Sequence, residues 1–173
     1  MSKVIISIPE HTLSELSQAD APWIYELMND PAYIENIGDR GIASIKEAKD
    51  YLINGPIASY RQHGFGLWKA VLRGSNAPIG ICGLLQREYL DYPDIGYATL
   101  SDFRGRGLTY LAVQLTITYF REHIFSEKLY GLTKLGNRAS QNLLTTAGFE
   151  LLEIRIINGL ETVLYKYDFV NRE

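Results

Sequence analysis

The stretch D-I-G-Y-A-T-L-S-D-F-R-G-R-G-L-T, residues 94 to 109, runs from a predicted strand into a predicted helix through alternating arginines and glycines. The first amides of a helix lack internal partners, and the aligned peptide dipoles place about half a positive charge there. Gly105 and Gly107 remove side chains that would keep a phosphate from the backbone, while Arg104 and Arg106 bring charge that can bridge a diphosphate. The loop is therefore predicted to be a pyrophosphate cradle.

The elements predicted around this loop follow an α+β order. Two strands before it are separated by a short turn containing Gly, Ser, Asn and Pro, which favours an antiparallel hairpin. Asn158-Gly159, the commonest two-residue hairpin signal, separates the last two strands. The order predicts an antiparallel meander, one strand-helix-strand crossover and a terminal hairpin. Strands are expected at residues 4–8, 65–72, 79–85, 94–100, 128–133, 149–157 and 160–167, and helices at 21–28, 45–60, 108–124 and 139–146.

Local signals set several of these boundaries. The segment S-I-K-E, Ser44 to Glu47, has the spacing of a capping box at a helix start. Asp30-Pro31 is expected to end the first helix, because proline continues a helix poorly. The helix at 108–124 carries two apolar stripes and is therefore expected to be largely buried.

The composition bounds the class of protein. The chain has 173 residues, of which 46% are hydrophobic, and a formal net charge of −3. These values favour a single domain spanning residues 1–173 and argue against an extended nucleic-acid footprint. No run approaches the roughly 20 apolar residues of a membrane span, and the start lacks a signal-peptide pattern. A soluble, cytoplasmic protein with no membrane partner and no metal is the default expectation, with Cys82, the only cysteine, a small buried core residue.

The sequence of this loop does not match two other nucleotide-binding motifs. The dinucleotide fingerprint G-x-G-x-x-G would need its third glycine at Tyr110, and the Walker loop would need G-K-[ST]. The pattern R-x-x-G-x-[GA] fits from Arg104 to Gly107, with Thr109 at the position of Gly or Ala.

The chain resembles the GNAT-superfamily N-acetyltransferases, and within them the Rim-type branch of ribosomal-protein N-alpha-acetyltransferases. The resemblance implies an α+β fold with a mixed, mainly antiparallel central sheet that has a V-shaped splay and is flanked by helices. It also implies transfer of the acetyl group of acetyl-CoA to a primary amine, on a protein N-terminus or a small molecule, by direct attack in a ternary complex. The likeness rests on the order and spacing of G-F-G-L-W, P-I-G-I-C-G-L-L-Q-R, D-I-G-Y-A-T-L-S-D-F-R-G-R-G-L and N-R-A-S-Q-N-L-L-T-T-A-G-F-E.

The same resemblance implies where acetyl-CoA binds. Its pyrophosphate would lie on the loop amides, and its pantetheine arm would add to the sheet as a pseudo-strand beside Tyr97, where this strand parts from the strand at 128–133. An amide near Tyr97 or Ala98 would polarise the thioester carbonyl. Asn137 would contact the arm, or alternatively cap the helix that follows it. The expected cofactor-binding residues are Tyr97, Ala98, Thr99, Leu100, Arg104, Gly105, Arg106, Gly107, Leu108, Thr109 and Asn137.

Acetyl transfer to an amine requires the amine to be neutral. At a free pKa near 10.4, deprotonation at pH 7 costs about 4.6 kcal/mol, so a base is expected. Glu88 is the first candidate, ahead of Asp91 and Asp94, although each also reads as a solvated turn residue. The run R-E-Y-L-D-Y-P-D, residues 87–94, is acidic and aromatic, which would suit a cationic amine. His63 is expected to be a helix-end residue rather than a base.

The departing thiolate needs a proton. Many superfamily members supply it from a tyrosine seven residues after the asparagine, a position that Leu144 occupies in this chain. By resemblance to the Rim-type branch, Ser140 becomes the candidate donor, with helix capping as the alternative role.

Two other functions remain open on the sequence alone. A non-catalytic module that senses acyl-CoA would keep the cradle and lose only the acid and base, and Thr109 and Leu144 are compatible with it. Nucleic-acid binding through the 12 tyrosines fits the acidic total poorly. No motif in the sequence identifies the acceptor, which could be a protein N-terminus, a polyamine, an antibiotic amine or another small amine. The sequence does not indicate the oligomeric state either.

Overall fold

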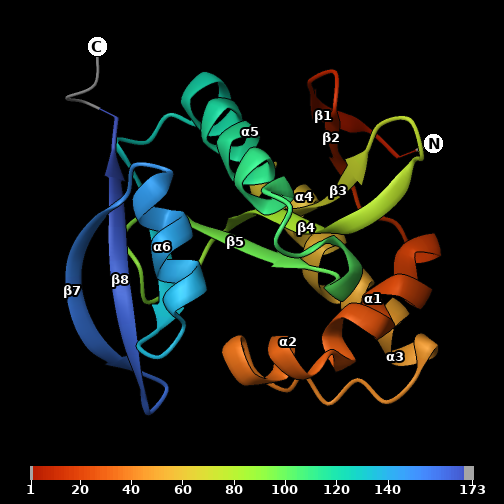
Figure 1. The fold of residues 1–173 in the computed structure, drawn as a ribbon, viewed down its shortest axis with the longest axis horizontal. Helices are drawn as coiled ribbons and strands as arrows, with labels where there is room; N and C mark the ends of the chain where they lie inside the picture. The colour runs from red at the N-terminus through yellow and green to blue at the C-terminus, as the bar shows by residue number, and fades with distance from the viewer. Residues whose placement is uncertain (1, 170–173) are drawn as a thin grey trace.

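The computed structural model describes residues 2–169, which form one sheet flanked by helices (Figure 1). The strands are β1 (Val4–Ser7), β2 (His11–Glu15), β3 (Leu67–Leu72), β4 (Ala77–Leu85), β5 (Asp94–Thr99), β6 (Lys128–Lys134), β7 (Glu150–Ile157) and β8 (Leu160–Asp168). The helices are α1 (Ala21–Asn29), α2 (Pro31–Asn36), α3 (Ile45–Leu52), α4 (Ala58–His63), α5 (Leu108–His123) and α6 (Arg138–Thr146), with a π-helical turn (Ile53–Ile57) and short 3-10 turns (Gln18–Asp20 and Ser101–Phe103).

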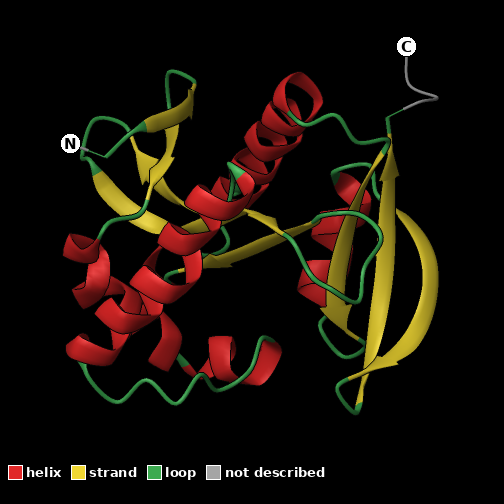
Figure 2. Cartoon of the chain, turned by 180° about the vertical axis from the view of Figure 1, so that it is seen from behind, coloured by secondary structure: helices red, strands yellow, loops and turns green. Residues whose placement is uncertain are grey.

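The sheet has the order β1-β2-β3-β4-β5-β6-β8-β7, and every neighbouring pair is antiparallel except β5 and β6. These two parallel strands are joined by α5, as the predicted crossover requires. They pair only at Asp94 with Tyr130 and at Ile95 with Gly131. Beyond Ile95 they diverge, so the V-shaped splay is confirmed, and Figure 2 shows the two halves of the sheet with α5 between them.

Helices cover both faces of the sheet and divide the core into two main clusters. One lies between the sheet and α5 with α6, and includes Trp68, Phe120 and Leu144. The other lies under α1 and α3, and includes Ile24, Leu52 and Ile81. The predicted burial of α5 is confirmed, and Cys82 is fully buried with its Sγ 3.2 Å from the hydroxyl of Thr116. No helix within residues 2–169 combines the length and apolar character needed to cross a bilayer.

Two elements were not predicted from the sequence, and one predicted helix is longer than expected. β2 pairs with both β1 and β3, although its sequence, H-T-L-S-E, gave no strand signal. α2 begins directly at Pro31, because Asp30 accepts the amides of Ala32 and Tyr33 and proline is well suited to a first helical position. The helix expected at 45–60 runs on to His63, and the π-helical turn accommodates Pro56 in its middle.

Candidate active site

The loop before α5 presents a row of unbound amides. Gly105 and Gly107 have φ of +70° and +73°, which favour glycine, and a Cβ at either position would meet nothing within 4 Å. Within the described chain, the backbone amides of residues 105–110 have no hydrogen-bond acceptor, whereas that of Leu111 donates to the carbonyl of Gly107 at 3.2 Å. A space open toward solvent and edged by helix-start amides is the geometry that an anionic phosphate fits.

The two arginines of the loop differ in their partners. Arg104 Nη2 lies 2.7 Å from Asp30 Oδ1, and its Nε donates to the carbonyl of Thr99 at 3.0 Å. Its guanidinium is therefore already paired with a carboxylate, and its charge on a diphosphate stays a prediction. Arg106 is exposed, and its guanidinium lies 5.6 Å from the ring centroid of Phe103.

Thr109 occupies the position where the loop pattern expects Gly or Ala. Its Oγ1 lies 2.6 Å from Oγ1 of Thr99, so the side chain ties the first turn of α5 to the end of β5. The threonine that replaces Gly or Ala in the pattern is thus hydrogen-bonded within the cradle.

The open edge of β5 leads from the cradle into the sheet. Leu100 donates its amide to Ile79 of the β4 side at 2.9 Å, while the carbonyl of Pro93 accepts from Tyr130 of β6 at 2.8 Å. Because backbone groups alternate along a strand, the amide of Ala98 faces β4 and that of Tyr97 faces the gap left by β6. Of the two amides considered from the sequence, Tyr97 is the one at the open edge.

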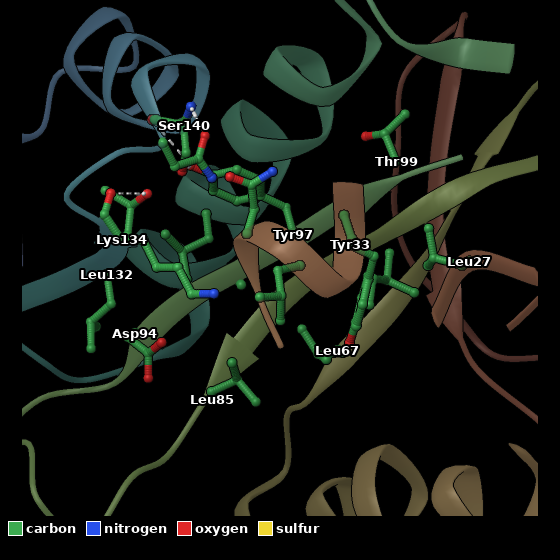
Figure 3. A pocket seen from close by; sticks show the side chains of 18 of the residues that line it. Leu27, Tyr33, Leu67, Leu85, Asp94, Tyr97, Thr99, Leu132, Lys134 and Ser140 are labelled. Carbon is green, nitrogen blue, oxygen red and sulfur yellow. Dashed lines mark hydrogen bonds between the residues drawn. The ribbon is translucent and has the colours of Figure 1, made fainter. Parts of the chain in front are cut away.

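Ser140, at the start of α6, meets Tyr97 of β5 (Figure 3). The Asn137 side chain accepts the amide of Ser140 at 3.1 Å, so it does cap α6. Ser140 Oγ lies 2.8 Å from the hydroxyl of Tyr97, and burial raises the pKa of that phenol. Leu144 is fully buried and packs toward Gly131 rather than into the gap.

These groups line a cavity of about 910 Å³ that extends from the cradle, through the splay, to α2 and α4. Ala98, Thr99, Gly105 and Gly107 line it together with Tyr97, Asn137 and Ser140. Leu100, Arg106 and Leu108, also predicted from the sequence, do not line it. Leu100 is buried in the sheet, and Arg106 projects outward.

The three candidate acids are separated by the fold. Glu88 and Asp91 are exposed and lie outside the cavity lining, so of the three candidate acids in the run at 87–94 only Asp94 contributes a carboxyl group to it. Asp94 lines the cavity, and its Oδ1 lies 2.7 Å from Arg87 Nε. Burial raises the pKa of Asp94 to about 6, and the Arg87 guanidinium opposes part of that rise. A carboxyl group with this pKa is ionised at neutral pH and still basic enough to accept a proton.

Sequence reasoning missed the side of the cavity formed by α2 and the loop after it. Tyr33 and Arg40 line it there, and Lys134 reaches across from β6. His63 also lines the cavity, and its ring stacks 5.8 Å from that of Phe65 at the end of α4. No local motif marks these residues, since they are brought together only by packing of α2 and α4 over the sheet.

Solved structures of known acetyltransferases share the fold of this chain. The acetyltransferase from Agrobacterium tumefaciens is 20% identical, with a TM-score of 0.81 over 94% of this chain and 92% of that chain. An acetyltransferase from Salmonella typhimurium, which modifies the N-terminal serine of a 50S ribosomal subunit protein, is 15% identical, with a TM-score of 0.79 over 96% and 99%. A microcin self-immunity acetyltransferase, solved with acetyl-CoA and AMP, is 16% identical, with a TM-score of 0.78 over 94% of each chain.

The TM-scores show that these proteins share the fold of this chain. The sequence profile described as "Acetyltransferase (GNAT) domain" matches residues 11–150, which is most of the chain. The protein therefore belongs to the GNAT acetyltransferase family.

Proposed function

We propose that this protein transfers the acetyl group of acetyl-CoA to a primary amine by direct attack in a ternary complex. The observation that carries the proposal is the continuity of one cavity, from the unbound amides of the cradle, along the open edge of β5, to the buried carboxyl group of Asp94. A cofactor with a diphosphate at one end and a thioester at the other matches this sequence of groups.

The chain's own residues fit acetyl-CoA at three points. The amides of residues 105–109 would hold the diphosphate, where the open positions above Gly105 and Gly107 leave room for it. Asn137 lines the cavity beside the open edge, so it would lie near the pantetheine arm while capping α6. The Tyr97 amide faces the gap and would donate to the acyl carbonyl oxygen. When bound, acetyl-CoA supplies an activated acyl thioester.

Asp94 is the base that this geometry favours in place of Glu88. It lines the cavity at the start of the splay, and as a carboxylate it accepts the proton that the amine loses, directly or through a water molecule. Arg87 holds the carboxylate in place through the 2.7 Å contact.

Ser140 is the proposed proton donor to the sulfur as the carbon–sulfur bond breaks. Its hydroxyl is 2.8 Å from that of Tyr97, and because burial raises the pKa of the phenol, Tyr97 stays protonated and can return a proton to Ser140. This pair fills the role left open by Leu144.

The test combines binding and turnover. We expect calorimetry to show binding of CoA and of acetyl-CoA, and a thiol assay to show CoA release that depends on an added amine. Binding without amine-dependent release across a broad amine panel would indicate the acyl-CoA sensor instead, and absence of binding would reject both functions.

A further inference from the structure

The cavity as a whole carries an excess of positive charge. Among the described residues that line the cavity, the charged side chains are four basic ones and one carboxylate, besides the single histidine, His63. The carboxylate is Asp94, and the basic residues are Arg40, Arg87, Arg104 and Lys134.

Two of these cations are neutralised by carboxylates and two are not. Arg104 pairs with Asp30 and Arg87 with Asp94, each at 2.7 Å. Within residues 2–169, Lys134 has no carboxylate partner, and its Nζ donates to the main-chain carbonyl of Glu35 in α2. Arg40 likewise lacks one. Its positive charge lies near the phenol of Tyr33, a residue that is 4% exposed, and opposes the rise in the pKa of Tyr33 that burial causes.

Both unneutralised cations lie by the later part of α2, whereas Arg104 pairs with Asp30 at its start. Arg40 follows α2 in the chain, and Lys134 reaches Glu35 near the end of α2 from β6 (Figure 3 shows Lys134, Tyr33 and Asp94). We take the part of the cavity lined by Tyr33, Arg40, Lys134 and Asp94 as the acceptor side. A dication such as a polyamine would meet repulsion there. A guanidinium fork matches the geometry of a carboxylate or phosphate, and a neighbouring ammonium adds to that attraction.

We propose that the acceptor is an amine that also bears an anionic group, a carboxylate or a phosphate, which Arg40 and Lys134 bind while the amine faces Asp94. The proposal rests on the acetyl transfer proposed above. The same positive charges lower the pKa of the bound amine and so favour its neutral, nucleophilic form.

Matched pairs of amines test the charge. We expect kcat/KM for CoA release to be at least about tenfold higher for β-alanine than for β-alaninamide, for phosphoethanolamine than for ethanolamine, and for Gly-Asp-Asp than for Gly-Asn-Asn, since losing one charge-assisted contact costs about tenfold or more. The first two pairs distinguish carboxylate from phosphate. Putrescine should be among the poorest acceptors.

Variants locate the preference. Arg40→Gln and Lys134→Gln should each reduce the ratio within a pair and leave CoA affinity unchanged, and Lys134→Arg should retain it. Arg61→Gln is the matched control, because Arg61 is exposed on α4 and outside the cavity lining. Equal or better turnover of the neutral partners overturns the proposal and leaves acetyl transfer standing. Loss of CoA affinity in the Arg40 and Lys134 variants also overturns it, since these cations would then serve the cofactor. Failure to bind CoA at all rejects the proposed function itself.

A separate observation concerns the outer edge of the sheet. β7 is the last strand in the sheet order, and it exposes large apolar side chains. Their exposed fractions are 60% for Leu151, 54% for Ile154 and 64% for Ile156. An apolar, unpaired edge strand in a folded chain is a site where another strand adds.

The backbone and charges of β7 are self-complementary. Ile157 and Leu160 flank the two-residue turn and exchange hydrogen bonds, so the amides of Ile156 and Ile154 face away from β8. Antiparallel pairing of two β7 strands about a two-fold axis at Ile154 uses these free amides and sets Glu153 opposite Arg155 of the other copy. Within one chain, Glu153 and Arg155 already form an ion pair with each other. A two-fold axis one residue later would oppose two Arg155 side chains instead.

We infer that a second copy of this chain pairs with β7, so that the protein is a two-fold symmetric dimer through this edge. Light scattering after size exclusion should give a dimer for the wild type. Glu153→Arg and Arg155→Glu should each raise the dimer dissociation constant by about tenfold or more, because like charges then face each other.

The reversed charges also provide the rescue. An equimolar mixture of the two single variants should form a heterodimer, and the double variant E153R/R155E should restore the homodimer. Lys46→Glu, an exposed change on α3, is the control. A monomeric wild type, or a dimer that neither reversal weakens, overturns this inference.

Discussion

At Asp94 the cavity holds a carboxyl group that is 1% exposed, with a pKa raised by burial to about 6. Asp94→Asn should lower kcat/KM by about 10²–10⁴-fold, the usual contribution of a general base, while Glu88→Gln should stay near the wild-type value. The base acts when ionised, so below about pH 6 wild-type kcat/KM should fall more steeply than protonation of the amine alone requires, and the Asp94→Asn profile should keep only the slope that the amine sets. Equal losses in the two variants would argue against the assignment.

The hydroxyl pair of Ser140 and Tyr97 should behave as one unit. Ser140→Ala and Tyr97→Phe should each lower kcat more than they change KM, because both act on the departing sulfur through the same 2.8 Å contact. The double variant should lose little more than the worse single variant. Ser126→Ala removes a hydroxyl that bonds only the carbonyl of Lys128, and serves as the control. Additive losses would show that the two hydroxyls work separately.

His11 is a buried residue whose effect is on stability. Within residues 2–169 neither ring nitrogen has a hydrogen-bond partner, the residue is 0% exposed, and desolvation lowers its pKa from 6.5. The unfolded chain therefore binds a proton that the folded chain resists, so the free energy of unfolding should fall as the pH drops below 6.5, by up to about 1.4 kcal/mol per pH unit.

His11→Leu should remove that slope and raise the free energy of unfolding at pH 5 by about 1–3 kcal/mol, as measured by urea titration. His123→Gln, at an exposed position, is the control. A slope that persists in His11→Leu would place the titration elsewhere.

At the scale of elements, the cradle is tested by two glycines in the same backbone region. Gly107 and Gly74 have φ of +73° and +97°, and a Cβ at either would meet nothing within 4 Å. Alanine at each should cost a similar 1–2 kcal/mol or so of stability. Gly107→Ala alone should weaken CoA binding about tenfold or more in calorimetry, because the new methyl group occupies the space over the amides. Equal CoA affinity in both variants would mean that the diphosphate binds elsewhere.

The elements that the sequence predicted are those with a strong local signal. Gly105 and Gly107 predict the open loop of the cradle, and the structure gives both a positive φ. The apolar stripes of α5 predict that this helix is buried. At Ser44 the predicted cap is confirmed, because the Ser44 hydroxyl accepts the amide of Glu47. The reciprocal bond of the capping box differs, because Glu47 accepts the amide of Ala43 rather than that of Ser44. β2 could not be predicted, because its strand character comes from pairing on both sides. The sequence ranks Asp94 below Glu88 for a related reason: burial, which raises the pKa of Asp94, is a tertiary property.

At the scale of the whole molecule, α2 connects the two halves of the splayed sheet. Asp30 at its start pairs with Arg104 of the cradle, and Lys134 of β6 donates to the carbonyl of Glu35 near its end. Tyr33 also anchors α2 in the core, but the ends of so short a helix open easily when these two contacts loosen. The cradle and the acceptor side are therefore linked through α2.

This link predicts a response to cofactor at a distance from it. A diphosphate on the amides of residues 105–109 would fix the loop that carries Arg104, and through Asp30 it should slow hydrogen exchange in α2, as measured by mass spectrometry with and without CoA. Asp30→Asn keeps the helix cap, because asparagine caps as well as aspartate, but removes the ion pair. In that variant CoA should still protect the start of α5 and should no longer protect α2. Asp39→Asn, which changes a loop carboxylate that accepts the amide of Gly41, should leave both effects intact. If CoA protects α2 equally in Asp30→Asn, the coupling runs through the Lys134 contact or the sheet, and the Arg104–Asp30 pair has no part in it.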